Sequence, residues 1–101
     1  MTQDGLEISD APDRRRFEAV LDGKVVGFLE YSRDGASTVL PHTEVDPAYE
    51  NRGIASRLAR AALDDARARG SKVVPVCPFV SAYLDAHPEY ADLDSRPASG
   101  R

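Results

Sequence analysis

The chain is poor in several residue types, and each shortage excludes a class of protein. A single cysteine, Cys77, leaves no internal disulfide, so the sequence fits a reducing, cytoplasmic environment. One cysteine and two histidines without ligand spacing predict no metal site. No apolar run is long enough to span a membrane, and the N-terminal residues lack the pattern of a signal peptide.

The 13 lysines and arginines are outnumbered by 17 aspartates and glutamates. The formal net charge is −4, whereas a nucleic-acid-binding domain normally carries a basic face. The run Arg14–Arg16 is too short to change this, and we interpret it as solvated charge at the end of a strand. We therefore expect no nucleic-acid or membrane partner, and a monomer or weak homodimer.

What is present is ordinary for one globular domain. Hydrophobic residues make up 42% and charged residues 30% of the 101 residues, which suffices for one modest core. The sequence shows no internal repeat and no second domain. We place the domain at residues 1–94, followed by a Pro-, Ser-, Gly- and Arg-containing tail at 95–101 that we expect to be disordered.

One long amphipathic helix is the strongest local prediction. It begins at Ile54, and Gly70 follows it as a helix-ending glycine. Its apolar stripe, spaced three or four residues apart, consists of Ile54, Ala55, Leu58, Ala59, Ala62, Leu63 and Ala66. A second, short helix is predicted at 78–87, because the residue before Pro88 disfavours helical conformation.

Alternation of polar and apolar residues predicts short strands around this helix. The expected strands are 14–21, 24–31, 37–45 and 72–77, with a tight turn at 22–23, a turn at 32–36, and a short edge strand or ordered arm near 6–8. Leu40, His42 and Glu44 are expected to share one strand face. The predicted fold class is α/β (α+β), with a mostly antiparallel sheet of four to five strands, a parallel splayed pair, one long helix and one short C-terminal helix.

Two prolines interrupt the strands that flank the long helix. Pro41 and Pro75 cannot donate to a strand ladder, which leaves two interpretations: two neighbouring parallel strands part at one end, or each proline marks an exposed edge. Beside them, Gly53 opens the helix with no side chain to keep an anion away from the first-turn amides. This local pattern fits a phosphate site, with Arg52 or Arg57 adding charge, and it also fits an ordinary helix start.

Two blocks of the sequence carry a resemblance to a known family. The segment Val45–Leu58 (VDPAYENRGIASRL) resembles the pyrophosphate loop of the GNAT superfamily of N-acetyltransferases, Arg/Gln-x-x-Gly-x-Gly/Ala. Gly53 and Ala55 match this pattern, and Glu50 departs from it. The later block VPVCPFV at 74–80, with Tyr83 and the HPEY of 87–90, is similar to very small GNAT-like acetyltransferases of about 100 residues. The resemblance covers roughly residues 14 to 93.

The resemblance implies a minimal GNAT-like fold and the use of acetyl-CoA as co-substrate. In this family the pantetheine arm enters between two splayed strands and the pyrophosphate rests on the following helix. The implied acetyl-CoA-binding residues are Val45, Glu50, Asn51, Arg52, Gly53, Ile54, Ala55 and Arg57. Backbone N–H groups near Val45 are implied to hold the acetyl oxygen. The acceptor is a small-molecule or protein amine.

Four side chains are candidates for the chemistry of acyl transfer. His42 and Glu44 could remove the amine proton, and a histidine titrates closest to neutral pH. By the family comparison, Tyr83 protonates the leaving sulfur; otherwise it is a core tyrosine. Cys77, before the short helix, could take the acetyl group covalently or could be a small buried hydrophobe. His87 could be its partner or a helix cap.

The sequence leaves three functions to compare. The favoured one is an acetyl-CoA-dependent N-acetyltransferase with an unknown amine acceptor. The alternative is a non-catalytic acyl-CoA-binding or regulatory module, which Glu50 and the lack of room for extra acceptor-site helices both favour. A third is a protein-interaction domain without a ligand. In the first case the acceptor site must be shallow or shared with a partner.

Overall fold

The computed structural model describes residues 5–96 of the chain. The elements follow in the order β1 (Leu6–Ala11), η1 (Pro12–Arg14), β2 (Arg16–Leu21), β3 (Lys24–Glu30), β4 (Ser32–Asp34), β5 (Ser37–Val39), β6 (Thr43–Val45), η2 (Pro47–Tyr49), α1 (Ile54–Ala68), β7 (Lys72–Val74), α2 (Pro78–Ala86) and η3 (Pro88–Leu93). Here α marks α-helices and η marks short 3₁₀ turns.

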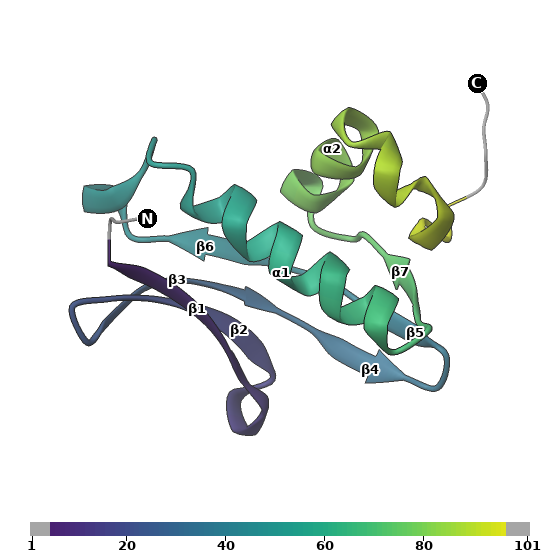
Figure 1. Ribbon diagram of the computed structural model, residues 1–101, viewed down its shortest axis with the longest axis horizontal. Coiled ribbons are helices and arrows are strands. Elements are labelled where there is room, and N and C mark those ends of the chain that lie inside the picture. The colour runs from purple at the N-terminus through teal and green to yellow at the C-terminus, as the bar shows by residue number, and fades with distance from the viewer. Residues whose placement is uncertain (1–4, 97–101) are drawn as a thin grey trace.

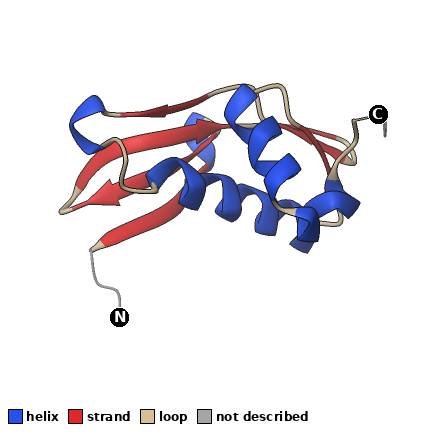
Figure 2. Cartoon of the chain, turned by 90° about the horizontal axis from the view of Figure 1, so that it is seen from above, coloured by secondary structure: helices blue, strands red, loops and turns tan. Residues whose placement is uncertain are grey.

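The strands form two sheets, and the helices pack against the same side of both. One is antiparallel, in the order β1-β2-β3-β6, and the other has the order β4-β5-β7, with β5 and β7 parallel. Helix α1 packs over the strands and α2 packs beside α1, so both helices cover the same side of the sheets (Figures 1 and 2). The predicted mixed fold, with one parallel pair, one long helix and one short helix, is confirmed. Among the described residues, neither helix is long and apolar enough to cross a bilayer.

The predicted strand 37–45 is divided into β5 and β6, and an additional strand, β4, forms inside the predicted turn, which explains the larger number of strands. The predicted turn at 32–36 is wrong in its first half, because Ser32–Asp34 pairs with Ser37–Val39 as β4 and β5. The turn is confined to Gly35 and Ala36, where Gly35 takes a positive φ of 61°. Strand β7 ends at Val74, three residues earlier than predicted, because Pro75 has no N–H to continue the ladder.

The strand predicted at 37–45 changes direction of pairing at Pro41. The N–H of Leu40 donates to the Val74 carbonyl and its own carbonyl accepts from Cys77 N–H, both on the β7 side. The carbonyl of His42 instead accepts from Glu30 N–H, on the β3 side. Groups two residues apart face the same way in a regular strand, so the backbone turns over between Leu40 and His42. The expectation that Leu40 shares a face with His42 and Glu44 is therefore wrong: Leu40 is buried and the other two are exposed.

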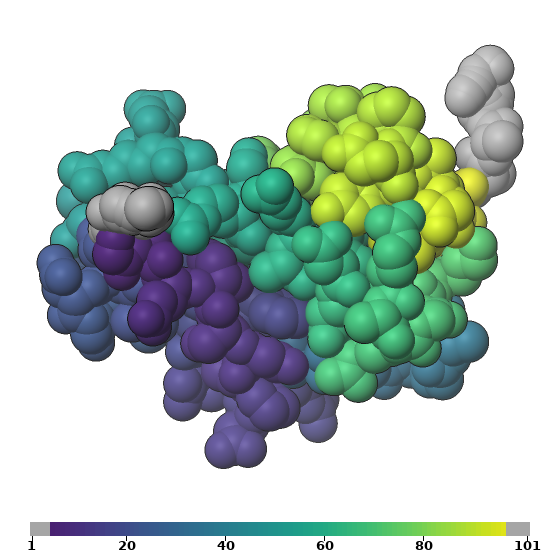
Figure 3. Space-filling model, in the orientation of Figure 1, coloured from purple at the N-terminus to yellow at the C-terminus, as the bar shows by residue number. Residues whose placement is uncertain are grey.

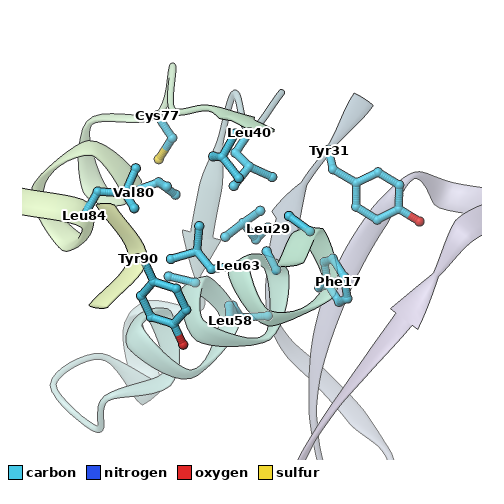
Figure 4. Packing of buried hydrophobic residues seen from close by; sticks show 14 of the residues in the cluster. Phe17, Leu29, Tyr31, Leu40, Leu58, Leu63, Cys77, Val80, Leu84 and Tyr90 are labelled. Carbon is cyan, nitrogen blue, oxygen red and sulfur yellow. The ribbon is translucent and has the colours of Figure 1, made fainter. Parts of the chain in front are cut away.

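The core lies between α1, α2 and the sheets. Its cluster runs from Phe17 and Tyr31 at one end, past the α1 leucines, to Cys77, Val80 and Leu84 at the other (Figure 4). The predicted apolar stripe of α1 is buried except at Ala55, which is half-buried. Gly27 lets the start of α1 approach β3, because a Cβ there would meet the Glu44 carbonyl oxygen at 3.1 Å and Ile54 at 3.4 Å.

The arginine run is solvated at Arg14 and Arg15, which are exposed, but it also pairs with a buried carboxylate. Glu18, which the alternation places on the polar side of β2, is only 3% exposed. Its carboxylate accepts from Arg14 Nε at 2.7 Å and from Arg16 Nε at 2.8 Å. The hydrogen bond from Arg14, reinforced by Arg16, lowers the pKa of Glu18 from 4.5 to about 2 against the opposing effect of burial. The sequence-based interpretation missed this pairing, in which two neighbouring arginines compensate a carboxylate that would otherwise avoid burial.

The end of the described chain is attached to the domain. Ser95 N–H donates to the Val73 carbonyl at 3.0 Å, and Arg96 donates to Asp94, Asp85 and Ser81. The first two residues of the predicted tail are therefore hydrogen-bonded to the domain. The rest of that tail, 97–101, lies outside the described residues.

Candidate functional site

A groove of about 390 Å³ opens beside the unpaired edge of β6, at the point where the chain enters α1. In the space-filling view, the surface is hollowed between the lobe formed around residue 50 and the lobe formed by α2 (Figure 3). The lining residues come from β6, the 46–53 loop, the first turn of α1 and the first turn of α2. They are Thr43, Val45, Tyr49, Glu50, Asn51, Gly53, Ile54, Ala55, Ser56 and Phe79. Six of the eight predicted acetyl-CoA-binding residues are in this set.

The start of α1 presents free backbone donors to the groove. Gly53 is the N-cap with a φ of 76°, and its carbonyl accepts the first helical bond from Arg57 N–H at 3.1 Å. The N–H groups of the first turn, Ile54 to Ser56, therefore have no partner within the helix. A Cβ at Gly53 would meet nothing within 4 Å, so the space beside these donors is open. This arrangement fits a phosphate or another anion.

One wall of the groove is the unpaired edge of strand β6. Strand β6 ends the order β1-β2-β3-β6, and no other described strand pairs with its outer side. Because His42 and Asp46 direct backbone groups toward β3, alternation directs those of Thr43 and Val45 outward. The splay predicted from the two prolines is confirmed. The pairing of β5 with β7 ends at Val39–Val74, and the next strand, β6, pairs with β3 and not with the β7 side. Extended amide-bearing molecules can pair with such an edge.

The two predicted arginines do not line the groove. The guanidinium of Arg57 donates to the Leu6 carbonyl on β1 at 3.2 Å. That of Arg52 belongs to an exposed residue and lies 5.2 Å from the centre of the Tyr49 ring. Neither side chain contributes positive charge to the wall itself, so the anion-binding capacity rests on the backbone of the first turn.

Cys77 lies behind the groove rather than in it. It caps α2, is 4% exposed, and belongs to the core cluster. Its Sγ donates to Thr43 Oγ1 at 3.4 Å, and Thr43 is the residue that separates it from the groove. The structure therefore brings Cys77 to the predicted splay, with its sulfur covered by a neighbouring hydroxyl.

Tyr83 lies one helical turn beyond the groove, and Phe79 takes the lining position. The Tyr83 ring stacks on His87 at 3.8 Å and lies 6.3 Å from the Phe79 ring. Burial raises the pKa of Tyr83, so its phenol stays protonated well above neutral pH. His87 Nδ1 bonds the Tyr83 carbonyl at 2.8 Å, which makes it a helix-capping residue rather than a neighbour of Cys77.

His42 and Glu44 lie on the opposite face of β6 from the groove. Their side chains are 52% and 63% exposed, and His42 Nε2 is 3.1 Å from Glu44 Oε1. The His42 ring also approaches Phe28 on β3, with ring centres 6.0 Å apart. The four predicted catalytic side chains are thus divided by β6, with Cys77 and Tyr83 on the helix side and this pair on the bare side.

Sequence reasoning missed four groove residues. Thr43, Tyr49, Ser56 and Phe79 line it without belonging to the glycine motif. Phe79 carried the clearest signal, because it sits directly after a helix-starting proline and remains 38% exposed although it is aromatic. Thr43 could have been found from the outward side of a strand that Pro41 separates from its neighbour.

Comparison with known proteins agrees with this geometry. Residues 16–93 match the family model of the GCN5-related N-acetyltransferases. The chain is 38% identical over 92 residues to the human protein NATD1, covering 85% of this chain and 80% of that protein. The zebrafish NATD1 is 36% identical over 93 residues, covering 86% and 83%.

Solved structures share the fold. The NMR structure of a GCN5-like protein from Staphylococcus aureus superposes with a TM-score of 0.71 at 19% identity, covering 98% of this chain and 99% of that one. The GNAT-family protein YhbS from Escherichia coli, solved with CoA, gives a TM-score of 0.57 at 25% identity, covering 71% and 47%. With a family model spanning most of the sequence, the chain belongs to the GCN5-related N-acetyltransferase family.

Proposed function

We propose that this protein is an N-acetyltransferase that uses acetyl-CoA as donor and an amine as acceptor. The observation that carries the proposal is the continuity of one groove. It joins the outward amides of β6 to the free first-turn amides of α1, beside a glycine that leaves room for an anion. Related folds solved with acetyl-CoA or CoA, from Brucella melitensis and Escherichia coli, support this assignment.

The groove residues divide the binding of the donor between them. The backbone at Gly53, Ile54 and Ala55 holds the pyrophosphate, with Glu50 and Asn51 on the loop beside it. The outward N–H groups of Thr43 and Val45 pair with the amide-bearing arm and orient the acetyl oxygen. Phe79 covers the apolar part of the arm. Arg52, beside the Tyr49 ring, and Arg57, held by β1, do not line the groove and act on the donor only as nearby positive charge.

Acetyl-CoA supplies an activated acetyl thioester, and the chain's own groups manage the acceptor. His42 and Glu44 take up the proton of the amine as its nitrogen bonds to the acetyl carbon and the carbon–sulfur bond breaks. We assign transfer directly to the acceptor, because the Cys77 sulfur is covered by Thr43 and buried in the core. Tyr83 does not line the groove, so it can return a proton toward the sulfur only through an intervening water or group.

The test uses the full chain with acetyl-CoA and a panel of primary amines. Thermal unfolding with CoA should show stabilisation of about 2.7 kcal/mol at a hundredfold excess over Kd. Release of free thiol that depends on the amine should follow. Stabilisation by CoA without thiol release would instead identify a non-catalytic binding module, and no stabilisation would remove the donor site altogether.

A further inference from the structure

A second hollow lies directly behind the groove, on the bare face of β6. It measures about 460 Å³ and is lined by Arg16, Val25, Val26, Gly27, Phe28, Glu44, Asp46 and Pro47. Phe28 and Glu44 are cross-strand partners, and successive side chains on a strand point to opposite faces. Glu44 therefore belongs to the hollow, whereas Thr43 and Val45 belong to the groove. Only the thickness of one edge strand separates the two.

The unpaired edge of β6 makes the two hollows neighbours. A molecule in the hollow can reach around that edge to the outward amides of Thr43 and Val45 without crossing a paired strand. The His42–Glu44 pair stands at the same place, on the hollow side. A site for the acceptor amine must place a nitrogen beside a proton-accepting group and within reach of the donor groove, and the hollow meets both conditions.

The lining selects the kind of amine. Val25, which is 40% exposed, and the Phe28 ring supply apolar surface that fits a hydrocarbon stem. Arg16 shares the Glu18 carboxylate with Arg14, donating from Nε at 2.8 Å, and its guanidinium lies 4.3 Å from the centre of the Phe28 ring. The remaining charged lining groups are two carboxylates, Glu44 and Asp46.

The two carboxylates are spaced along one direction. Glu44 and Asp46 are two residues apart on an extended segment, which separates their backbone positions by about 7 Å. An ammonium group already approaches one of them: Lys24 Nζ lies 3.9 Å from Asp46 Oδ2, at the end of an exposed aliphatic side chain. This internal pair shows that Asp46 can receive a cation carried on a hydrocarbon stem.

We propose that the hollow is the acceptor site and that it takes an unbranched aliphatic diamine. One amine is held near Glu44 and His42 and reacts, and the second, as ammonium, pairs with Asp46 in place of Lys24. This inference rests on the proposed function and specifies its acceptor. The transfer step is unchanged: the new bond joins the amine nitrogen to the acetyl carbon, and His42 or Glu44 accepts the proton.

The experiment compares two acceptors of matched length with acetyl-CoA and the full chain. 1,5-Diaminopentane and n-pentylamine differ by one terminal ammonium, and free-thiol release gives kcat and KM for each. We expect the diamine to have a KM lower by about fivefold, the scale of a partly exposed ion pair. High salt should shrink this preference, because the attraction is screened.

Three variants make the test specific. Asp46→Asn keeps an oxygen for the Ala48 N–H, which Asp46 Oδ1 accepts at 2.9 Å, and removes the charge. It should abolish the diamine preference by raising the KM of the diamine to that of n-pentylamine. Lys24→Gln removes the internal competitor and should lower the diamine KM further. Asp34→Asn, an exposed carboxylate on β4 outside the hollow, is the matched control and should change neither acceptor.

The outcomes separate the two proposals. Thiol release that is equal for both acceptors, or a preference that survives Asp46→Asn, overturns the diamine site and leaves the acetyltransferase intact. Turnover only with a lysine-containing peptide also overturns it, in favour of a protein acceptor. Absence of thiol release with every amine, together with no stabilisation by CoA, removes the proposed function itself.

Discussion

The two faces of β6 are built in opposite ways. On the helix side the groove offers mainly backbone: free first-turn amides of α1, the outward N–H groups of Thr43 and Val45, and a glycine. On the bare side the hollow offers charged side chains, with Arg16, Glu44 and Asp46 around the Phe28 ring. Backbone donors suit a fixed, shared group such as a pyrophosphate, whereas side chains can change between relatives without altering the fold.

The two faces of β6 are also stabilised by different interactions. The groove side is continuous with the core through Cys77, Leu40 and Ile54, so its shape is fixed by packing. The bare side is held by the Arg14–Glu18–Arg16 cluster, which fixes the guanidinium of Arg16 over Phe28. Donor binding should therefore respond to backbone changes, and acceptor chemistry should respond to charge changes.

The largest effect is expected for Gly53→Val. A branched residue at a φ of 76° is strained, and its side chain occupies the open space beside the first-turn amides. We expect the CoA-dependent stabilisation of about 2.7 kcal/mol at a hundredfold excess over Kd to disappear in thermal unfolding, together with turnover. Gly35→Val carries similar backbone strain at a φ of 61° far from the groove and should keep both. CoA stabilisation in the Gly53 variant would contradict the groove assignment.

Removing the proton acceptors should affect the opposite face alone. In the double variant His42→Gln/Glu44→Gln we expect kcat to fall about a hundredfold, the scale of general base catalysis. CoA stabilisation should stay at the wild-type value, because neither side chain lines the groove. The kcat of each single variant then shows whether His42 or Glu44 is the base, because only removal of the base should lower kcat. Glu7→Gln, on the far edge strand, is the control, and a loss of CoA binding in the double variant would argue against two independent faces.

The Glu18 cluster gives a stability prediction with a defined pH range. Glu18→Gln should lower the free energy of unfolding at pH 7 by about 2 kcal/mol, since it removes charged hydrogen bonds to two arginines. Arginine contacts lower the pKa of Glu18 from 4.5 to about 2, so the wild-type carboxylate stabilises the fold above pH 4.5.

That stabilisation is lost as the pH falls from 4.5 toward 2, where the folded carboxylate also takes a proton. Urea unfolding at pH 7 and at pH 3 should therefore show a smaller difference between the two pH values for Glu18→Gln than for the wild type. Equal pH dependence in both proteins would show that the two arginines do not stabilise the carboxylate.

The smallest effect is expected for Cys77→Ser. A serine hydroxyl can keep the bond to Thr43, so the loss of stability should be about 1 kcal/mol and turnover should change little. Intact mass after incubation with acetyl-CoA should reveal no acetyl adduct on the wild-type chain. A stable adduct that vanishes in Cys77→Ser, together with lost turnover, would establish the covalent route and join Cys77 to the donor face.

Local signals in the sequence were enough to predict the elements on the groove side of β6. The spacing of Leu58, Leu63 and Ala66 predicts the buried stripe of α1, and Gly53 predicts an open first turn. Pro41 and Pro75 predict the splay, because a residue without an N–H ends a ladder wherever the chain folds. The fold class and six groove residues followed from these features together with the family resemblance.

The remaining assignments needed the third dimension. Alternation along 37–45 could not show that the backbone turns over between Leu40 and His42, which separates the buried leucine from the exposed histidine. Nor could spacing show that Tyr83 stacks on His87 while Phe79 takes its place at the groove. Both outcomes depend on which element packs against which.

By itself the sequence determined the elements, their caps and the open start of α1, because propensity, glycine and proline act within a few residues of the chain. Only the tertiary structure decided that β6 carries an open groove on one face and a charged hollow on the other, that Arg57 contacts β1, and that Glu18 is buried. These features arise from contacts between segments distant in sequence or from the burial that such contacts impose, and no local pattern encodes them.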